Sequence, residues 1–212
     1  MGEICRSCGP RRHNRPDGEP PMFLDHATAF TKFEPVQPAP TLPRGPAFAP
    51  GTLIDTSRGW RPVEDLAPGD RVQTFDGGLV PLVRATCDEG PSVRLWHVPA
   101  GAIGNCSDFT LAEGQFIGFR GRMAQRLFGI PLVMAPATAL GGFRGIRPAK
   151  GSAPTITLAF AQEDIAMAQT GTLLLVPGQT PARHYQRLDY GQTRSLLLLT
   201  DPRGCAPDLR VA

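Results

Sequence analysis

Short segments of alternating apolar and polar residues recur along this chain of 212 residues from about residue 52 onward. Alternation of this kind is typical of strands that bury one face. It predicts strands at 52–56, 71–75, 79–86, 92–98, 109–111, 116–119 and 172–176, and two more within 155–168 on either side of a polar turn at 162–164.

Helical spacing is confined to short stretches. The apolar residues Met123, Leu127 and Phe128 predict one short helix over 122–128, and a second is expected around 182–188, ahead of an apolar run at 195–200. A further apolar segment, 131–140, ends at Gly141-Gly142.

The stretch 47–78 is organised by two turns. In Pro68-Gly69-Asp70 the proline sets φ and the glycine permits a positive φ, which predicts a chain reversal before the strand at 71–75. Asp76-Gly77-Gly78 predicts a tight hairpin. With a single helical turn at 63–66, the stretch is expected to form a compact β module.

Composition favours the same fold class. The 23 prolines and 24 glycines predict many turns and few long helices, and therefore an all-β architecture. With 41% hydrophobic positions, the chain is long enough for one domain and an appendage. We expect a Pro- and Arg-rich tail over 1–46, a β domain over 47–180 and a C-terminal extension over 181–212.

Charge and targeting signals exclude several classes of function. The 22 Lys and Arg residues face 19 Asp and Glu, and a net charge of +3 is too small to indicate nucleic acid binding. No run approaches the roughly 18 apolar residues of a membrane span, and the first residues lack the apolar region of a secretory signal. Five irregularly spaced cysteines indicate reduced thiols, so a cytoplasmic location is expected.

The first 46 residues contain one cluster of metal-binding residue types, Cys5, Cys8, His13 and His26. It could form part of a zinc site or a redox pair. A structural zinc needs four ligands at defined spacing, and a redox C-x-x-C pair needs a βαβ context. Neither context is visible, so incidental thiols are favoured, and no metal or cofactor is expected.

The run PGTLI…RGWRPVEDLAPGDRVQTFDGG, over 50–78, resembles the opening of a Hint domain, the fold shared by inteins and hedgehog autoprocessing domains. The resemblance is closest to bacterial stand-alone Hint proteins. It continues, in the family's order, in GAIGN at 101–105, in the pattern RG-x-x-A-x-x-LFG at 120–129 and in LVPG at 175–178. It implies an all-β Hint fold with one or two short helices.

The resemblance also implies a chemistry, which this chain lacks at the matching positions. Family members begin autoprocessing when a Cys just before the PGT element attacks the preceding carbonyl, helped by a His on a later strand. Here Ala47 stands at the Cys position and Gln115 at the His position, while Glu163-Asp164 replaces a common His-Glu pair. A methyl group cannot attack, and an amide cannot deliver a proton near neutral pH. We therefore expect a degenerate autoprocessing fold that serves as an interaction or structural module with an unknown protein partner.

Two alternatives remain open at the level of sequence. A displaced thiol, Cys106 or Cys87, could still carry out a self-cleaving acyl shift, or the N-terminal Cys and His residues could bind a metal. His97 could titrate, although a polar residue on a strand face is favoured. Intein splicing is not expected, because it needs a His-Asn pair at the C-terminal junction and His13-Asn14 lies near the other end.

Overall fold

The computed structural model describes residues 45–180 and 184–201, all of which belong to one compact unit, Leu42–Ala212. The expected metal cluster and most of the expected tail lie outside these residues. The domain boundaries drawn from the sequence stay predictions.

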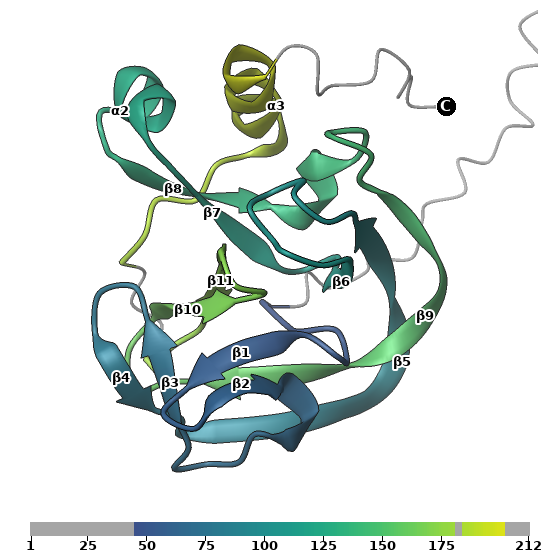
Figure 1. Ribbon diagram of the computed structural model, residues 1–212, viewed down its shortest axis with the longest axis vertical. Coiled ribbons are helices and arrows are strands. Elements are labelled where there is room, and N and C mark those ends of the chain that lie inside the picture. The colour runs from purple at the N-terminus through teal and green to yellow at the C-terminus, as the bar shows by residue number, and fades with distance from the viewer. Residues whose placement is uncertain (1–44, 181–183, 202–212) are drawn as a thin grey trace, which may run out of the picture. The chain divides into compact units, whose positions relative to one another are not determined.

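Two antiparallel sheets form the body of the described unit. The larger has the order β2-β1-β3-β10-β11-β7-β8, with β4 also paired to β3, and the smaller has the order β6-β5-β9. In Figure 1 the long strands β5 and β9 curve together along one side, while both α-helices lie beyond β7 and β8. The strands are β1 (Leu53–Thr56), β2 (Gly59–Pro62), β3 (Arg71–Thr74), β4 (Gly78–Pro81), β5 (Arg84–Val98), β6 (Phe109–Ala112), β7 (Phe116–Arg120), β8 (Leu132–Pro136), β9 (Arg147–Ala159), β10 (Asp164–Ala168) and β11 (Thr172–Val176).

The helices are short. Within the described residues they are α2 (Arg122–Phe128), α3 (Tyr190–Thr200) and two 3-10 turns, η2 (Val63–Asp65) and η3 (Ala137–Leu140). The all-β fold class with two short helices is therefore confirmed, as are the helix at 122–128 and the helical turn at 63–66.

The turn at Pro68-Gly69-Asp70 forms as predicted. Gly69 has a φ of 93°, and the Asp70 N–H donates to the Ala67 carbonyl at 3.1 Å. The Asp70 carboxylate accepts from the Ala67 N–H and pairs with Arg61 and Arg58, at 3.0 and 3.3 Å. The Ala67 hydrogen bond, followed by the two arginines, holds the pKa of Asp70 below its ordinary value.

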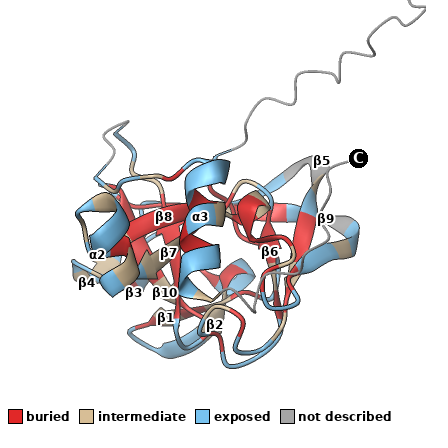
Figure 2. Ribbon diagram, turned by 90° about the horizontal axis from the view of Figure 1, so that it is seen from above, coloured by how far each residue is buried: buried red, intermediate tan, exposed pale blue. Residues whose placement is uncertain are grey.

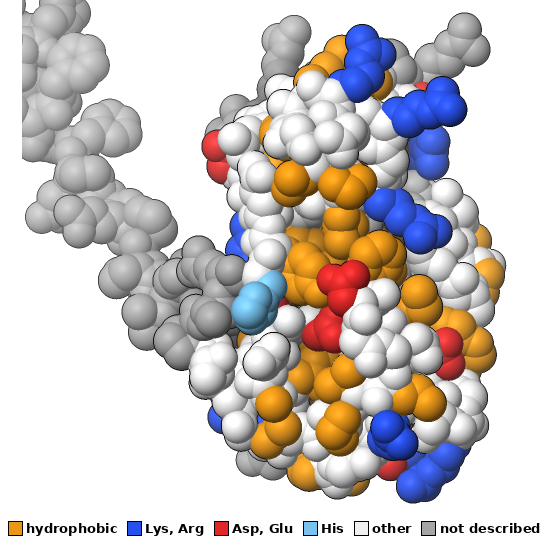
Figure 3. All heavy atoms as spheres, turned by 90° about the vertical axis from the view of Figure 1, so that its left-hand side faces the viewer, with side chains coloured by type: hydrophobic (Ala, Val, Ile, Leu, Met, Phe, Trp, Pro, Cys, Tyr) orange, Lys and Arg blue, Asp and Glu red, His pale blue; other side chains and the backbone are white. Residues whose placement is uncertain are grey.

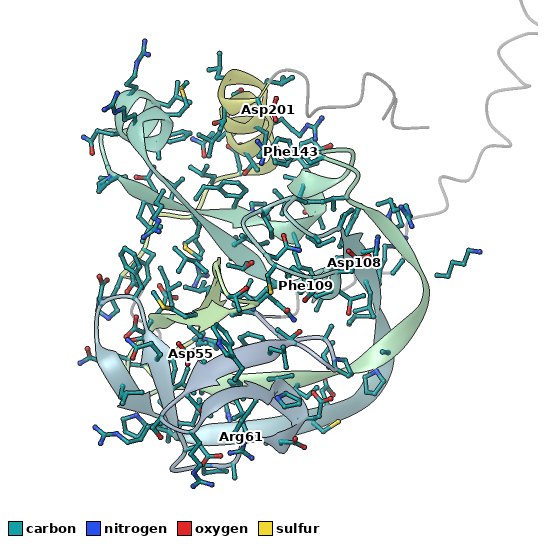
Figure 4. The ribbon with its side chains drawn as sticks, in the orientation of Figure 1. Asp55, Arg61, Asp108, Phe109, Phe143 and Asp201 are labelled. Atoms are coloured by element: carbon teal, nitrogen blue, oxygen red, sulfur yellow. The ribbon has the colours of Figure 1, made fainter. Side chains whose placement is uncertain are left out.

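The second helix was predicted in the wrong place. Residues 184–189 are not helical, because the Met134 N–H donates to the Gln186 carbonyl and the Leu188 N–H to the Met134 carbonyl, which pairs this segment with β8. The helix begins only at Tyr190, where Asp189 and Gln192 form a capping box. Its end is held by Arg144, which donates to Asp201 at 2.9 Å and lies over the Phe143 ring (Figure 4).

The division of this region into separate strands at 79–86 and 92–98 was also wrong. Residues 84–98 form one strand, and the register with β9 shifts between Asp88 and Val93. The polar, glycine-containing stretch is thus accommodated as an irregularity within a long strand pair. Strand β2 and the first half of β9 were not predicted, because neither shows clear alternation.

The core fills the space between the two sheets. Buried residues follow the strands, while α2 and the outer side of α3 are largely exposed (Figure 2). Its largest members include Phe48, Ile54, Ile117, Leu158 and Phe160, which come from both sheets and from the chain leading into β1.

Candidate functional site

Ala47 lies where the chain enters the domain, and backbone bonds hold it beside β9. The Phe48 N–H donates to the Ile156 carbonyl at 2.8 Å, and the Ile156 N–H returns a bond of 2.9 Å. The Thr52 hydroxyl donates to the Ala49 carbonyl at 2.7 Å and fixes the turn into β1. Ala47 is only 8% exposed, so its methyl group faces protein on most sides.

A pocket of about 190 Å³ opens at Ala47. Its other lining residues come from the entering chain, from the β6–β7 turn and from the paired strands β5 and β9. They are Gly45, Pro46, Asp88, Val93, Ala112, Gly114, Thr155 and Thr157. The structure thus brings Ala47 next to the turn that contains Gln115.

Gln115 is itself buried, with 1% of its surface exposed. Its N–H donates to the Ala112 carbonyl at 3.0 Å, and its side-chain Oε1 accepts from the Phe116 N–H at 3.0 Å. Its Nε2 has no hydrogen-bond partner among the described residues. A buried polar donor without a partner typically costs about 1–3 kcal/mol, so this amide is not placed there for stability.

Glu163 and Asp164 lie at a different site, where β9 turns into β10, and neither lines the Ala47 pocket. Glu163 accepts from the His184 and Tyr185 N–H groups, at 3.0 and 3.4 Å, and forms an ion pair with Arg187. These carboxylates therefore hold the segment that precedes α3. Of the positions carried over from the family, Ala47 thus lines the pocket and Gln115 lies in the adjacent turn, whereas Glu163 and Asp164 lie at the β9–β10 turn.

Tyr185 adds to that second cluster. Its hydroxyl donates to Asp76 at 2.7 Å and lies 3.2 Å from an Asp164 oxygen. Burial, followed by the hydrogen bond to Asp76 and the charge of Asp164, raises the pKa of Tyr185 above its ordinary value. The hydroxyl therefore stays protonated and acts as a donor between two acids.

The displaced-thiol candidates lie away from the Ala47 pocket. Cys106 is exposed on the loop between β5 and β6, where the Asn105 amide donates to the Pro99 and Ser107 carbonyls. Cys87 is exposed and lines a separate pocket of about 180 Å³ with, among others, Glu64 and Ile156. Neither thiol is among the residues that line the pocket at Ala47.

His97 lies near one carboxylate of the β5–β6 loop. Its Nε2 lies 3.6 Å from an Asp108 carboxylate oxygen, and the other oxygen of that carboxylate accepts from the Ala100 N–H at 2.8 Å. Figure 4 shows Asp108 beside Phe109, at the start of β6. The His97 side chain is partly exposed.

Within residues 45–180 and 184–201, no group of three or more His, Cys, Asp or Glu side chains is arranged to hold a metal ion. In the same part of the chain, no helix has the length and apolar character needed to cross a membrane.

Sequence reasoning missed the β5–β9 contribution to the pocket. Thr155 and Thr157 reach it from one face of β9, and Asp88 pairs with Thr155 across the ladder. The sequence shows alternating polar and apolar residues at 155–158, which places Thr155 and Thr157 on one face of a strand. Only the pairing of β9 with β5 and with the entering chain brings that face to Ala47.

Residues 46–172 match the family model of the Hint domain. The match covers more than half of the chain, and the protein therefore belongs to the Hint domain family. This confirms the family assigned from the turns of 47–78 and, with the observed strands, the all-β Hint fold.

Solved structures of intein type are similar to this chain. The MchDnaB-1 intein is 17% identical with a TM-score of 0.40, over 61% of this chain and 99% of that one. A bacterial intein-like domain from Clostridium thermocellum is 14% identical with a TM-score of 0.45, over 63% and 99%. No curated protein matches this sequence significantly.

Proposed function

We propose that this protein is a Hint domain without the self-cleaving reaction, which serves as an interaction or structural module for an unidentified protein partner in the cytoplasm. The observation that carries the proposal is the methyl group of Ala47 at the pocket that receives the entering chain. An acyl shift needs a side-chain nucleophile at that position, and a methyl group has no lone pair.

The neighbouring residues support the same function. The described lining of the pocket includes no Cys, His or Lys side chain. Gln115 is buried close by with a free amide donor, which can hydrogen-bond to a carbonyl but cannot protonate a departing amide nitrogen near neutral pH. The domain keeps a hydrogen-bond donor near the pocket, while the family's positions for the nucleophile and the general acid hold Ala47 and Gln115. The polar side chains that line the pocket are those of Asp88, Thr155 and Thr157.

The test is the intact mass of the purified full-length protein during long incubation, with and without dithiothreitol. We expect the full mass throughout, because neither a thioester nor an ester can form at residue 47. A fragment cut immediately before Ala47 would overturn the proposal.

Self-cleavage through Cys106 is the competing hypothesis. It requires the thiol to approach a peptide carbonyl, whereas Cys106 is exposed on the β5–β6 loop and does not line the pocket. The Cys106→Ala protein should therefore stay at its own full mass throughout the incubation, as the unmodified chain does at its own. A fragment that forms in the unmodified protein and is absent from Cys106→Ala would favour the competing hypothesis.

A further inference from the structure

The charge of this chain is distributed unevenly. Between Glu113 and Glu163 there is no acidic residue, but there are five arginines and one lysine. Three of these arginines, Arg120, Arg122 and Arg126, lie at or within α2, and all three are exposed. The helix therefore presents a concentrated positive charge on a molecule whose net charge is only +3.

Part of this charge is unfavourable for the helix itself. Arg122 and Arg126 stand four residues apart, where like charges repel. Arg122 is also the first helical residue, next to the positive end of the helix dipole, and no acidic residue lies in that first turn, whereas Arg126 lies in the last turn, where a positive charge is favourable. Among the described residues, none of the three arginines forms an ion pair. These exposed guanidinium groups are therefore available to an external anion.

One apolar side chain of α2 is exposed beside the arginines. Leu127 is 40% exposed, whereas Met123 and Phe128 pack against the buried cluster of Ala124, Val133, Leu188 and Leu196. Figure 3, which faces the α2 side of the molecule, shows basic side chains gathered along the upper right edge with hydrophobic side chains beside them. A short helix with exposed arginines and an exposed leucine has the character of a segment that lies on a membrane surface.

We propose that α2 docks the protein onto an anionic lipid surface, with Arg120, Arg122 and Arg126 at the lipid headgroups and Leu127 inserted at the acyl boundary. A flat bilayer fits because α2 lies at the edge of the fold, outside β7 and β8 (Figure 1), with its arginines and Leu127 exposed. An acidic peptide would need a groove, and nucleic acid would leave Leu127 without a role. The proposal does not depend on the loss of self-cleavage at Ala47.

The experiment is co-sedimentation of the full-length protein with vesicles. One set contains equimolar phosphatidylcholine and phosphatidylserine, and the other contains phosphatidylcholine alone. We expect binding only to the anionic vesicles, with a steep decrease as salt is added. Replacing the three arginines with glutamine should weaken binding roughly a hundredfold, because each headgroup contact of a basic residue contributes separately.

Two further variants of this protein test whether binding depends on α2. A matched triple variant, Arg84→Gln, Arg94→Gln and Arg147→Gln, removes the same charge from exposed positions on β5 and β9 and should bind nearly as well as the unmodified protein. The Leu127→Gln variant keeps every charge and should bind roughly fivefold more weakly. The α2 triple variant should unfold at nearly the same temperature, because the relief of the Arg122–Arg126 repulsion offsets the loss of the favourable charge of Arg126 in the last turn.

Three outcomes would overturn the proposal. The first is full binding by the α2 triple variant, and the second is an equal loss in the matched variant, which would assign binding to net charge. The third is binding of a double-stranded oligonucleotide that is as tight as binding of the anionic vesicles and is lost in the α2 triple variant. In that case α2 would recognise nucleic acid phosphates and not lipid.

Discussion

Glu163 and Arg187 form an ion pair that ties the β9–β10 turn to the segment preceding α3. The Glu163 side chain is 3% exposed and the Arg187 side chain 20%, and the guanidinium also lies 5.1 Å from the centre of the Phe116 ring. Glu163 also accepts two backbone N–H groups of the same segment, so its carboxylate adds to the backbone bonds between this segment and Met134 in holding residues 184–188 against the sheet.

Replacing Glu163 with glutamine should lower the free energy of unfolding by about 2–3 kcal/mol, because Arg187 would remain largely buried without its counter-ion. Chemical denaturation at neutral pH measures this. The Glu163→Gln/Arg187→Met double variant should recover part of the loss, since it removes the unpaired charge. A double variant less stable than the sum of both single changes would contradict this account.

Asp70 should make stability depend on pH at the acid end. Its pKa is lowered in the folded state by the Ala67 N–H and the two arginines, so its contribution is present above the ordinary unfolded value of about 4 and is lost as pH falls toward the folded value. Asp70→Asn should therefore cost about 1–2 kcal/mol at pH 7 and almost nothing near pH 2.

Thermal unfolding of Asp70→Asn and of the unmodified protein between pH 7 and pH 2 tests this pH dependence. The matched control is Asp55→Asn, because the Asp55 side chain on β1 forms no hydrogen bond or ion pair with the described residues. This change should alter the melting temperature little at either pH. A difference between Asp70→Asn and the unmodified protein that stays constant from pH 7 to pH 2 would contradict it.

Thr170 carries backbone strain. It has a φ of 59° in the turn between β10 and β11, a conformation that β-branched residues disfavour. Thr170→Gly should raise the free energy of unfolding by about 1 kcal/mol. Gln162→Gly, at an exposed position without positive φ, should be neutral or destabilising, and equal stabilisation by both changes would contradict the argument.

The Ala47 pocket can be tested by restoring the family's residues. If Ala47 stands at the reactive position, Ala47→Cys/Gln115→His should release a fragment cut before residue 47, and dithiothreitol should accelerate the release. Ala47→Cys alone should react about 10²–10⁴-fold more slowly without a general acid.

Mass spectrometry over time follows the release of that fragment. The control is Ala49→Cys/Gln115→His, which places the thiol at a buried position two residues away and outside the pocket lining. Equal cleavage in the control would show that the position of the thiol does not matter.

Much of the fold could be predicted because its signals are local. The turn at Pro68-Gly69-Asp70 depends on the backbone preferences of adjacent residues, and its geometry formed as expected. The start of α3 was equally readable, since Asp189 and Gln192 form a capping box at the spacing that caps a helix. The prediction at 182–188 overlooked that pair.

The sequence by itself determined the fold class, the turns of the opening module and the residue types at Ala47 and Gln115. Only the tertiary structure decided which distant segments meet. It brought Thr155 and Thr157 to Ala47 through the pairing of β5 with β9. It also separated Glu163 from that pocket and joined it to Arg187. The reason is physical: a contact between residues far apart in the chain depends on strand register and sheet order, and it leaves no periodic pattern in the local sequence.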